Sequence, residues 1–417
     1  MREPGALLEH LFRRQAGRMV AHFTRLLGAG HLELAEESVQ ESMLRALQTW
    51  PYQGVPENAE AWLFRVAHNA AIDAVRRNRI LDEKRIELDL VESAASSPDD
   101  PDIEEQLRDD ELRMICMCCH PELSRDASVA LSLKTVGGFS VREIARAFLS
   151  EESTIAQRLV RAKRQIRETG LTLEMPSAQD LRERLDAVLE VIYFIFNEGY
   201  AAHEGEDLIR RDLCFEALRL GQLIARSSLT SPRVDALVAL MALQTARLAA
   251  RVDEAGNLVL LDSQDRGRWD QHLIALGFQY FDRSMQGEDV SEYHVQAAIA
   301  ATHARASVSA STDWPLILAL YDQLLALNGS AVVALNRAVA VAKVHGPAEG
   351  LAAIEGLERD PKLSDYYLFL AVRGHLLLEL GRRSEAARHF RDALERPCSE
   401  PERRFLRRKL AECEGSP

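Results

Sequence analysis

Apolar residues recur at helical spacing in three runs within the first 80 residues. Gly28 and Gly30 interrupt the pattern after the first run, and the segment from Pro51 to Pro56 interrupts it after the second. The apolar positions are Leu8, Phe12, Met19, Phe23 and Leu26, then Leu34, Val39, Met43 and Leu47, then Leu63, Val66, Ala70 and Ala74. The sequence therefore predicts three helices in this part of the chain.

The stretch VESAASSPDDPD that follows combines Ser, Pro and Asp with almost nothing to bury, which predicts a flexible linker. Helical spacing resumes in short segments near Glu111, and from about Gln179 the chain is rich in Ala and Leu and helical almost throughout. Period-two alternation is not sustained anywhere, and LVLL at 258–261 is the only plausible short strand. We expect an all-α fold, with a helical domain at 1–80, a linker at 81–110, a second helical domain at 111–172 and a helical extension at 178–417.

A weak internal repeat is visible near the C-terminus. Gly374, Ala386, Phe390 and Ala393 fall where a tetratricopeptide helix pair needs close contact, and Gly346 precedes Gly381 by 35 residues, close to that repeat's length of about 34. Only the last unit fits well. An irregular helical bundle stays open as the alternative, because Ala-rich helices mimic this repeat easily.

The segment FSVREIARAFLSEESTIAQRLVRAKRQIRE, from Phe139, has the pattern of a helix-turn-helix motif. Ile144 and Ala145 belong to a short first helix, and Ile155 and Leu159 form the buried side of a second one. Residues 156–167 contain five basic residues and no acidic residue. Such a helix can enter a major groove with its N-terminal part and contact phosphates with the remainder. A solvated basic face on an ordinary helix is the plainer alternative.

A second polar face lies on AEAWLFRVAHNAAIDAVRRNR, from Ala59. Arg65, Asn69, Asp73 and Arg76 recur every three or four residues opposite the apolar side, and Trp62, His68 and Arg77 join them. This mixture of cations, amides and aromatics suits unpaired bases, which stack on planar side chains. Taken alone, an exposed polar helix surface is the simpler interpretation.

The two segments in this order, separated by an acidic linker, resemble an extracytoplasmic-function sigma factor over residues 5–170. The resemblance implies a factor that binds core RNA polymerase and promoter DNA, recognises the −35 and −10 elements and promotes initiation. It implies that AEESVQESMLRAL contacts the polymerase through Glu37, Gln40, Glu41 and Leu44. It assigns the melted −10 strand to Trp62, Arg65, His68, Asn69, Asp73, Arg76 and Arg77. It assigns the −35 duplex to Thr154, Gln157, Arg158, Arg161, Lys163 and Arg164.

The remaining chain is similar to the C-terminal extension of one subgroup of these factors, which ends in tetratricopeptide-like helices. The similar segments are YFIFNEGY from Tyr193, DSQDRGRWD from Asp262 and ALNRAVAVAKVHGPAEGL from Ala334. The resemblance implies that the extension has a regulatory role and that a protein or peptide partner binds it.

Composition agrees with several soluble domains, since 417 residues exceed what one core usually supports. The net charge of −13 would argue against nucleic acid, but residues 82–111 carry thirteen acidic and three basic residues and hold most of the excess. No apolar run is long enough to span a bilayer and the N-terminus lacks a signal-peptide core, so we expect a cytoplasmic protein without a membrane partner.

Cys116, Cys118, Cys119 and His120 crowd together and could suggest a zinc site. Adjacent cysteines diverge by about 100° on a helix, so small buried hydrophobes are the favoured interpretation. Asp262 to Asp270 concentrates carboxylates and arginines, but no nucleophile or phosphate-binding loop accompanies it. We therefore expect no enzymatic activity, no cofactor and no metal.

Two other functional classes stay open from the sequence. One is a helix-turn-helix regulator with a ligand- or peptide-binding helical domain, which would have no need of the polar face from Trp62 to Arg77. The other is an adaptor that binds peptides through tetratricopeptide-like repeats, which would leave the DNA-binding half unexplained.

Overall fold

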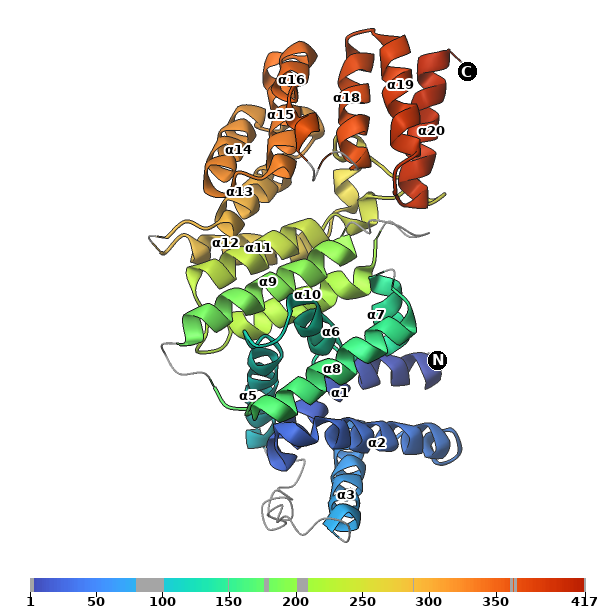
Figure 1. Ribbon diagram of the computed structural model, residues 1–417, viewed down its shortest axis with the longest axis vertical. Coiled ribbons are helices and arrows are strands. Elements are labelled where there is room, and N and C mark those ends of the chain that lie inside the picture. Colours follow the sequence, from blue (N-terminus) through green and yellow to red (C-terminus); the bar gives the residue numbers. More distant parts are fainter. Residues whose placement is uncertain are drawn as a thin grey trace. The chain divides into compact units, whose positions relative to one another are not determined.

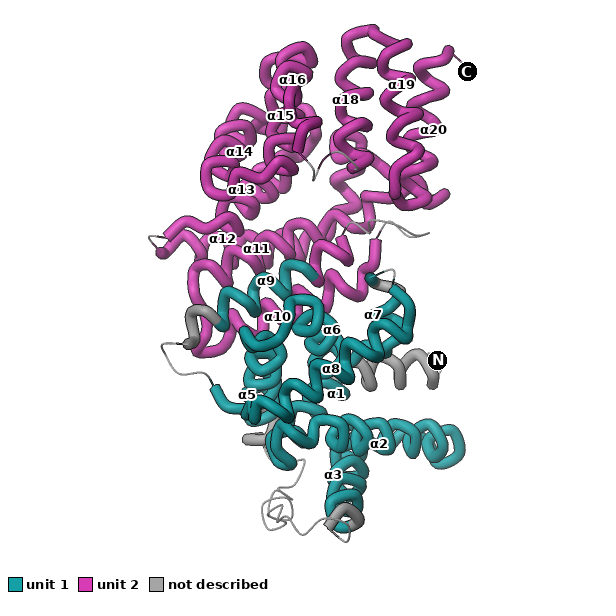
Figure 2. The backbone as a smooth tube through the Cα atoms, in the orientation of Figure 1, with its two compact units in different colours: residues 1–194 teal, residues 195–417 magenta. Residues whose placement is uncertain are grey.

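The computed structural model describes residues 4–79, 101–148, 150–175, 180–200, 209–287, 289–360, 363 and 366–415. It divides into two compact units, residues 1–194 and residues 195–417 (Figure 2). The described residues are organised as helices and contain a single isolated β-bridge, between Val252 and Leu258. The expected all-α class is therefore confirmed, whereas the short strand expected at 258–261 does not form.

The first unit contains the three helices expected before residue 80, followed by the helices of the second predicted domain (Figure 1). Its elements are α1 (Pro4–Leu27), η1 (Ala29–His31), α2 (Leu32–Gln53), α3 (Ala59–Arg79), α5 (Pro101–Cys118), α6 (Arg125–Thr135), α7 (Val141–Ala147), α8 (Glu152–Thr169) and the start of α9 (Asp180–Tyr200). Gly28 and Gly54 both have a positive φ, at 89° and 82°, which explains why glycine ends α1 and α2.

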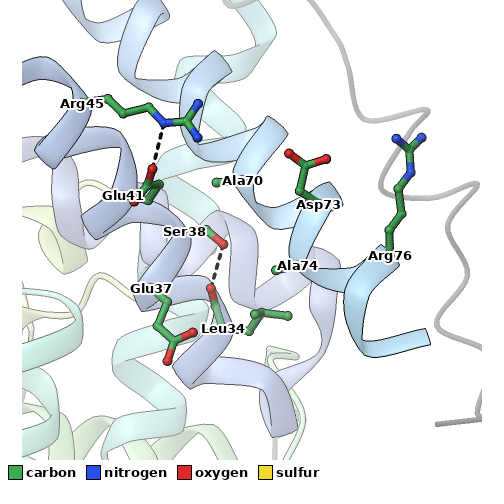
Figure 3. A pocket seen from close by; sticks show the side chains of 9 residues that line it. All are labelled: Leu34, Glu37, Ser38, Glu41, Arg45, Ala70, Asp73, Ala74 and Arg76. Carbon is green, nitrogen blue, oxygen red and sulfur yellow. Dashed lines mark hydrogen bonds and ion pairs between the residues drawn. The ribbon is translucent and has the colours of Figure 1, made fainter. Parts of the chain in front are cut away.

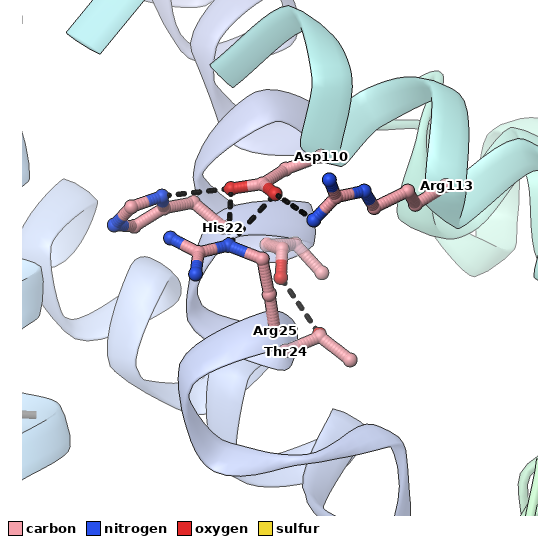
Figure 4. Close-up of polar contacts among 6 residues, drawn as sticks. His22, Thr24, Arg25, Asp110 and Arg113 are labelled. Atoms are coloured by element: carbon pink, nitrogen blue, oxygen red, sulfur yellow. Dashed lines mark hydrogen bonds and ion pairs between the residues drawn. The ribbon is translucent and has the colours of Figure 1, made fainter. Parts of the chain in front are cut away.

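The predicted linker at 81–110 is wrong at its C-terminal end, because α5 already begins at Pro101. Residues 80–100 lie outside the described part of the chain. The helix is stabilised by its contact with α1, where Asp110 is buried beside His22 and Arg25 (Figure 4). The Asp110 carboxylate lies 2.9 Å from His22 Nδ1 and 2.8 Å from Arg25 Nε. Asp110 is therefore buried with partners from α1, whereas the composition of its segment predicts an exposed side chain.

The buried side of α3 differs slightly from the expected one. Leu63, Ala67, Ala71 and Val75 are fully buried, with Phe64 packed against Phe23 at a ring distance of 5.3 Å. The predicted positions Val66, Ala70 and Ala74 are only half-buried. The helix is thus rotated by part of a turn, so that its aromatic residue faces the core.

The second unit is a succession of helices in which neighbours along the chain pack on one another (Figure 1). Beginning with α10 (Arg211–Ala225), its helices are α11 (Pro232–Thr245), α12 (Gln271–Ser284), α13 (Glu292–Arg305), α14 (Trp314–Asn328), α15 (Ala331–His345), α16 (Pro347–Ala353), α18 (Tyr367–Glu379), α19 (Arg383–Leu394) and α20 (Glu400–Glu414). The 3-10 turns are η2 (Leu248–Ala250), η3 (Leu261–Ser263), η4 (Arg266–Arg268), η5 (Ser309–Ser311) and η6 (Leu357–Arg359).

The close contact expected near the C-terminus is present between α18 and α19. A Cβ at Gly374 would meet the ring of Phe390 at 3.1 Å, and Ala386, Phe390 and Ala393 are fully buried. Gly346 and Gly381 both adopt a positive φ, at 99° and 74°. Gly346 lies between α15 and α16, and Gly381 lies between α18 and α19.

Within the described ranges, no helix combines the length and the apolar content that crossing a membrane requires.

Candidate nucleic-acid and polymerase interface

Helices α7 and α8 form the predicted helix-turn-helix motif. A capping box begins α7, in which the Ser140 hydroxyl accepts from Glu143 N at 3.1 Å and the Glu143 carboxylate accepts from Ser140 N at 2.8 Å. Ile144 and Ile155 are fully buried where the two helices cross. The motif therefore presents the opposite side of α8 to its surroundings.

The outer side of α8 carries the residues assigned to duplex DNA, and most of them are exposed. Thr154, Gln157, Arg161 and Arg164 are exposed, as a reading helix requires. Arg158 is half-buried, with Nη2 3.1 Å from Asp126 Oδ2. This ion pair directs Arg158 toward α6.

Lys163 differs from the exposed residues of α8 because it contacts α2. Its Nζ lies 2.6 Å from Glu36 Oε2, and its side chain is 12% exposed. Arg167 on the same helix lies 4.0 Å from Glu33. The sequence assigned Lys163 to DNA, but in this structure its ammonium is paired within the protein.

A second close contact joins α1 to the end of α6 through their backbones. A Cβ at Gly17 would lie 1.9 Å from the carbonyl oxygen of Val136 and 2.7 Å from its carbon. Such an approach is possible only for glycine. The first three helices and the helix-turn-helix motif are therefore packed together in the first unit.

The polar side of α3 is exposed where the sequence predicts contact with single-stranded DNA. Arg65, Asn69, Asp73 and Arg76 are exposed, and Trp62 is half-buried with its ring 5.4 Å from that of Trp50. The side chain of Arg77 lies outside the described part. This side of α3 presents cations, an amide and a carboxylate together.

His68 is buried, although the sequence assigned it to contact with the melted −10 strand. It is 7% exposed, with its ring 6.4 Å from that of Phe23 in the core. The reason is its spacing from Phe64, since residues four apart share one face of a helix. We therefore assign His68 to the packing of α3 rather than to a DNA contact.

A groove of about 630 Å³ between α2 and α3 brings two predicted sets of residues together (Figure 3). Glu37 and Glu41, assigned to polymerase, line it beside Asp73 and Arg76, assigned to DNA. Arg45 also lines it and was missed, although its spacing of four residues from Glu41 was a usable signal. Its Nε lies 2.8 Å from Glu41 Oε1.

The surface of α2 that the sequence assigns to polymerase contact has further exposed apolar residues near it. Glu37 and Gln40 are exposed, and Leu44 is 53% exposed. Leu47 and Tyr52, which the prediction did not include, are 47% and 89% exposed. Exposed apolar residues next to charged ones on a helix are typical of a protein-binding surface.

Comparisons with known proteins match two parts of the chain to known families. Residues 11–80 match the family Sigma-70 region 2, and residues 113–166 match the family Sigma-70, region 4. The RNA polymerase sigma factor CarQ of Myxococcus xanthus is 30% identical over 136 residues, covering 33% of this chain and 73% of CarQ. The chain belongs to the sigma-70 family of RNA polymerase sigma factors. Its region two and region four imply promoter recognition, with core RNA polymerase and promoter DNA as partners.

The helical extension is also found in a relative. An uncharacterized protein of Rhizobium meliloti (strain 1021) is 41% identical over 390 residues, which cover 93% of this chain and 92% of the relative. Residues 184–285 match a family of unknown function, DUF6596. No solved structure matches the chain. The extension is thus part of a longer shared architecture of this sigma factor and its relative.

The cysteine cluster is buried at the end of α5. Cys116, Cys118 and Cys119 are at most 2% exposed, and Cys118 Sγ lies 3.3 Å from Thr135 Oγ1. Burial raises the pKa of Cys116 to about 11 and that of Cys118 to about 12. These thiols are therefore protonated at neutral pH and pack as small core side chains.

The Asp262–Asp270 segment makes contacts that order the loop. Arg266 donates from Nη1 to Ala306 O at 2.6 Å and from Nη2 to Thr312 Oγ1 at 3.0 Å. The Asp270 carboxylate accepts from the backbone N of His272 and Leu273 at the start of α12. Arg266 and Asp270 thus have structural roles.

Proposed function

We propose that this protein is an extracytoplasmic-function sigma factor whose C-terminal extension regulates it. It binds core polymerase through α2, holds the melted −10 strand on α3 and reads the −35 duplex with α8. The main support is that α3 and α8, in domains matching regions two and four, each expose a polar face suited to its proposed DNA substrate. Transcription by purified core polymerase, with and without the protein, tests the proposal.

The packing of the first unit implies that the two DNA-reading helices separate during function. By their names, the two promoter elements lie roughly 25 base pairs apart, or about 85 Å along B-form DNA at 3.4 Å per base pair. A compact body of this size has a radius of gyration of only about 16 Å. The contacts of Lys163 with Glu36 and of Gly17 with Val136 therefore open before both elements are bound. Opening also frees Lys163 for the −35 duplex.

The extension is proposed to influence region four through α9, which contains Phe194. Phe194 stacks on Phe148, which ends α7, with the rings 5.7 Å apart and nearly parallel. The Arg125 guanidinium of α6 also contacts Phe194, at 5.0 Å from the centre of its ring. A protein or peptide that binds the extension would thereby shift the population of closed and open sigma domains.

Arg161→Ala is expected to weaken binding to the −35 duplex by about 1–3 kcal/mol, because this exposed arginine can pair with a base edge. Binding to core polymerase should be unchanged. Electrophoretic mobility shifts on promoter and scrambled duplexes measure the effect, with Arg388→Ala on α19 as a control for loss of an exposed cation. Equal weakening on both duplexes would show that Arg161 contacts phosphates only.

Replacing Asn69 and Arg76 together with alanine is expected to impair promoter opening more than closed-complex binding. Both side chains lie on the exposed side of α3 that is assigned to extruded bases. Permanganate footprinting on duplex and premelted templates measures opening, and Glu60→Ala in the first turn of α3 is the control. A double variant that no longer binds the duplex and is not rescued by a premelted bubble would overturn the assignment.

A further inference from the structure

The second unit contains a groove that the sigma activity does not use. It lies between α14 and α15 on one side and α18 on the other, and has a volume of about 290 Å³. The turn at residues 260–262 and one side chain of α20 complete its wall. Half-buried apolar side chains form most of the lining: Trp314, Tyr321, Val339, Leu368, Val372 and Phe405.

The groove is long enough for an extended chain. Its lining on α18 runs from Leu368 to Glu379, and the eleven steps between these two residues at a rise of 1.5 Å each give about 16 Å. An extended peptide rises about 3.3 Å per residue, so about five residues span this length. The volume accommodates only part of such a segment, namely the side chains that point inward.

Two hydrogen-bonding groups in the groove stand out because the described residues supply no partner for them. Among the described residues, neither the indole N–H of Trp314 nor the carboxamide of Asn336 makes a hydrogen bond. A carboxamide presents a donor and an acceptor side by side, which matches the N–H and C=O of a peptide backbone. His303, which also lines the groove, is 7% exposed, and its Nδ1 has no partner in the described part of the chain. Burial lowers the pKa of His303 to about 3, so it is neutral.

One end of the groove has an excess of negative charge. Lys343 Nζ lies 2.6 Å from Asp262 Oδ2, so these two charges compensate each other. Glu379 lies 3.5 Å from His375 Nε2, but burial lowers the pKa of His375 and leaves it neutral at neutral pH. Nearby Lys409 pairs with Glu412 at 2.8 Å. A cation on the ligand would compensate Glu379.

We infer that this groove binds an extended apolar peptide segment of about five residues with a lysine or arginine at the end that lies beside Glu379. This inference rests on the proposed regulatory role of the extension and specifies the chemistry of its partner. The apolar side chains of the segment fill the space beside Trp314 and Val372, while its backbone pairs with Asn336.

The test measures binding to the full-length protein without polymerase or DNA. The probe is the fluorescein-labelled, C-terminally amidated peptide Gly-Leu-Phe-Leu-Val-Lys, followed by fluorescence anisotropy. A second probe with Glu in place of Lys should bind about fivefold more weakly, because it places like charges together. Val339→Asp should weaken the lysine peptide by about tenfold or more, because it introduces a charge into the apolar lining.

Matched variants distinguish specific binding in the groove from nonspecific binding of the peptide. Asn336→Leu removes the pairing amide at similar volume and should weaken binding at an unchanged melting temperature. Leu316→Asp, at a 43% exposed position of α14 outside the groove, should bind like the wild type. Absence of peptide binding, or equal binding by Val339→Asp and Leu316→Asp, would overturn the inference. Such a failure is distinct from failure of the sigma activity, which is measured separately by transcription.

Discussion

Gly17→Ala is expected to open the first unit and to increase affinity for core polymerase by roughly tenfold. A Cβ at this position would lie 1.9 Å from a backbone oxygen at Val136, and backbone atoms cannot give way as a flexible side chain does. Overpacking of this kind typically costs about 1–3 kcal/mol and occasionally more. The substitution favours α1 itself by up to about 1 kcal/mol, since alanine is the better helix former. The closed packing is therefore penalised while the helix is not.

Small-angle scattering and core-polymerase binding together measure this effect. Affinity rises when the binding-competent form becomes more populated, because the apparent dissociation constant varies inversely with that population. Glu36→Gln should open the unit in the same direction but less, since it removes only the Lys163 ion pair. Glu412→Gln, which breaks the Lys409 pair in the second unit, is the control. An open particle that binds core polymerase no better than the wild type would contradict the proposed opening.

Truncation after Thr172 is expected to reduce transcription by roughly tenfold or more, within the range usual for coupled sites. The truncation removes Phe194, which stacks on Phe148, together with the whole second unit. This direction follows from the regulatory role that we propose for the extension. Run-off transcription, affinity for core polymerase and a melting curve are measured on the same preparation.

A second truncation, after Tyr200, separates two contributions. It keeps α9 and removes the rest of the extension. Phe194 and Arg184 therefore remain, and Arg184 donates from Nη1 to the Cys116 carbonyl oxygen at 3.5 Å. If the contact of Phe194 with Phe148 suffices for regulation, the protein that ends at Tyr200 recovers most of the activity. Full activity and unchanged affinity for core polymerase in a folded protein that ends at Thr172 would contradict the regulatory proposal. Heightened activity would retain the coupling and reverse its sign.

Local patterns predicted the helices and the helix-turn-helix motif well. Ile144 in α7, Ile155 in α8 and the capping Ser140 are each determined by neighbours within a few residues. The buried side of α3 was predicted less well, because Val66 and Ala71 are both apolar and only packing decides which one faces the core. His68 was misplaced for the same reason.

Contacts between residues far apart in sequence could not be predicted. Lys163 and Glu36 are 127 residues apart, and each resembles an ordinary exposed charge in its own helix. Asp110 was assigned to a linker because its partners, His22 and Arg25, lie on α1. Composition reports how many charges a segment carries, but tertiary structure determines which of them are compensated.

The groove in the second unit illustrates a further limit. Trp314, Asn336 and Lys343 come from consecutive helices, whereas His375 and Glu379 come from α18. The sequence indicated helix pairs and a possible peptide partner, but not which side chains meet. Three-dimensional packing was needed to show that apolar side chains and unpaired polar groups share one surface.

The most direct test of the central claim is run-off transcription with purified core RNA polymerase on the DNA upstream of the protein's own gene. The account predicts a transcript from one defined start site only when the protein is present, and loss of that transcript with the Asn69 and Arg76 double variant. Binding of the protein to the duplex without association with core polymerase, and without a transcript, would contradict the account. That result would favour a conventional helix-turn-helix regulator.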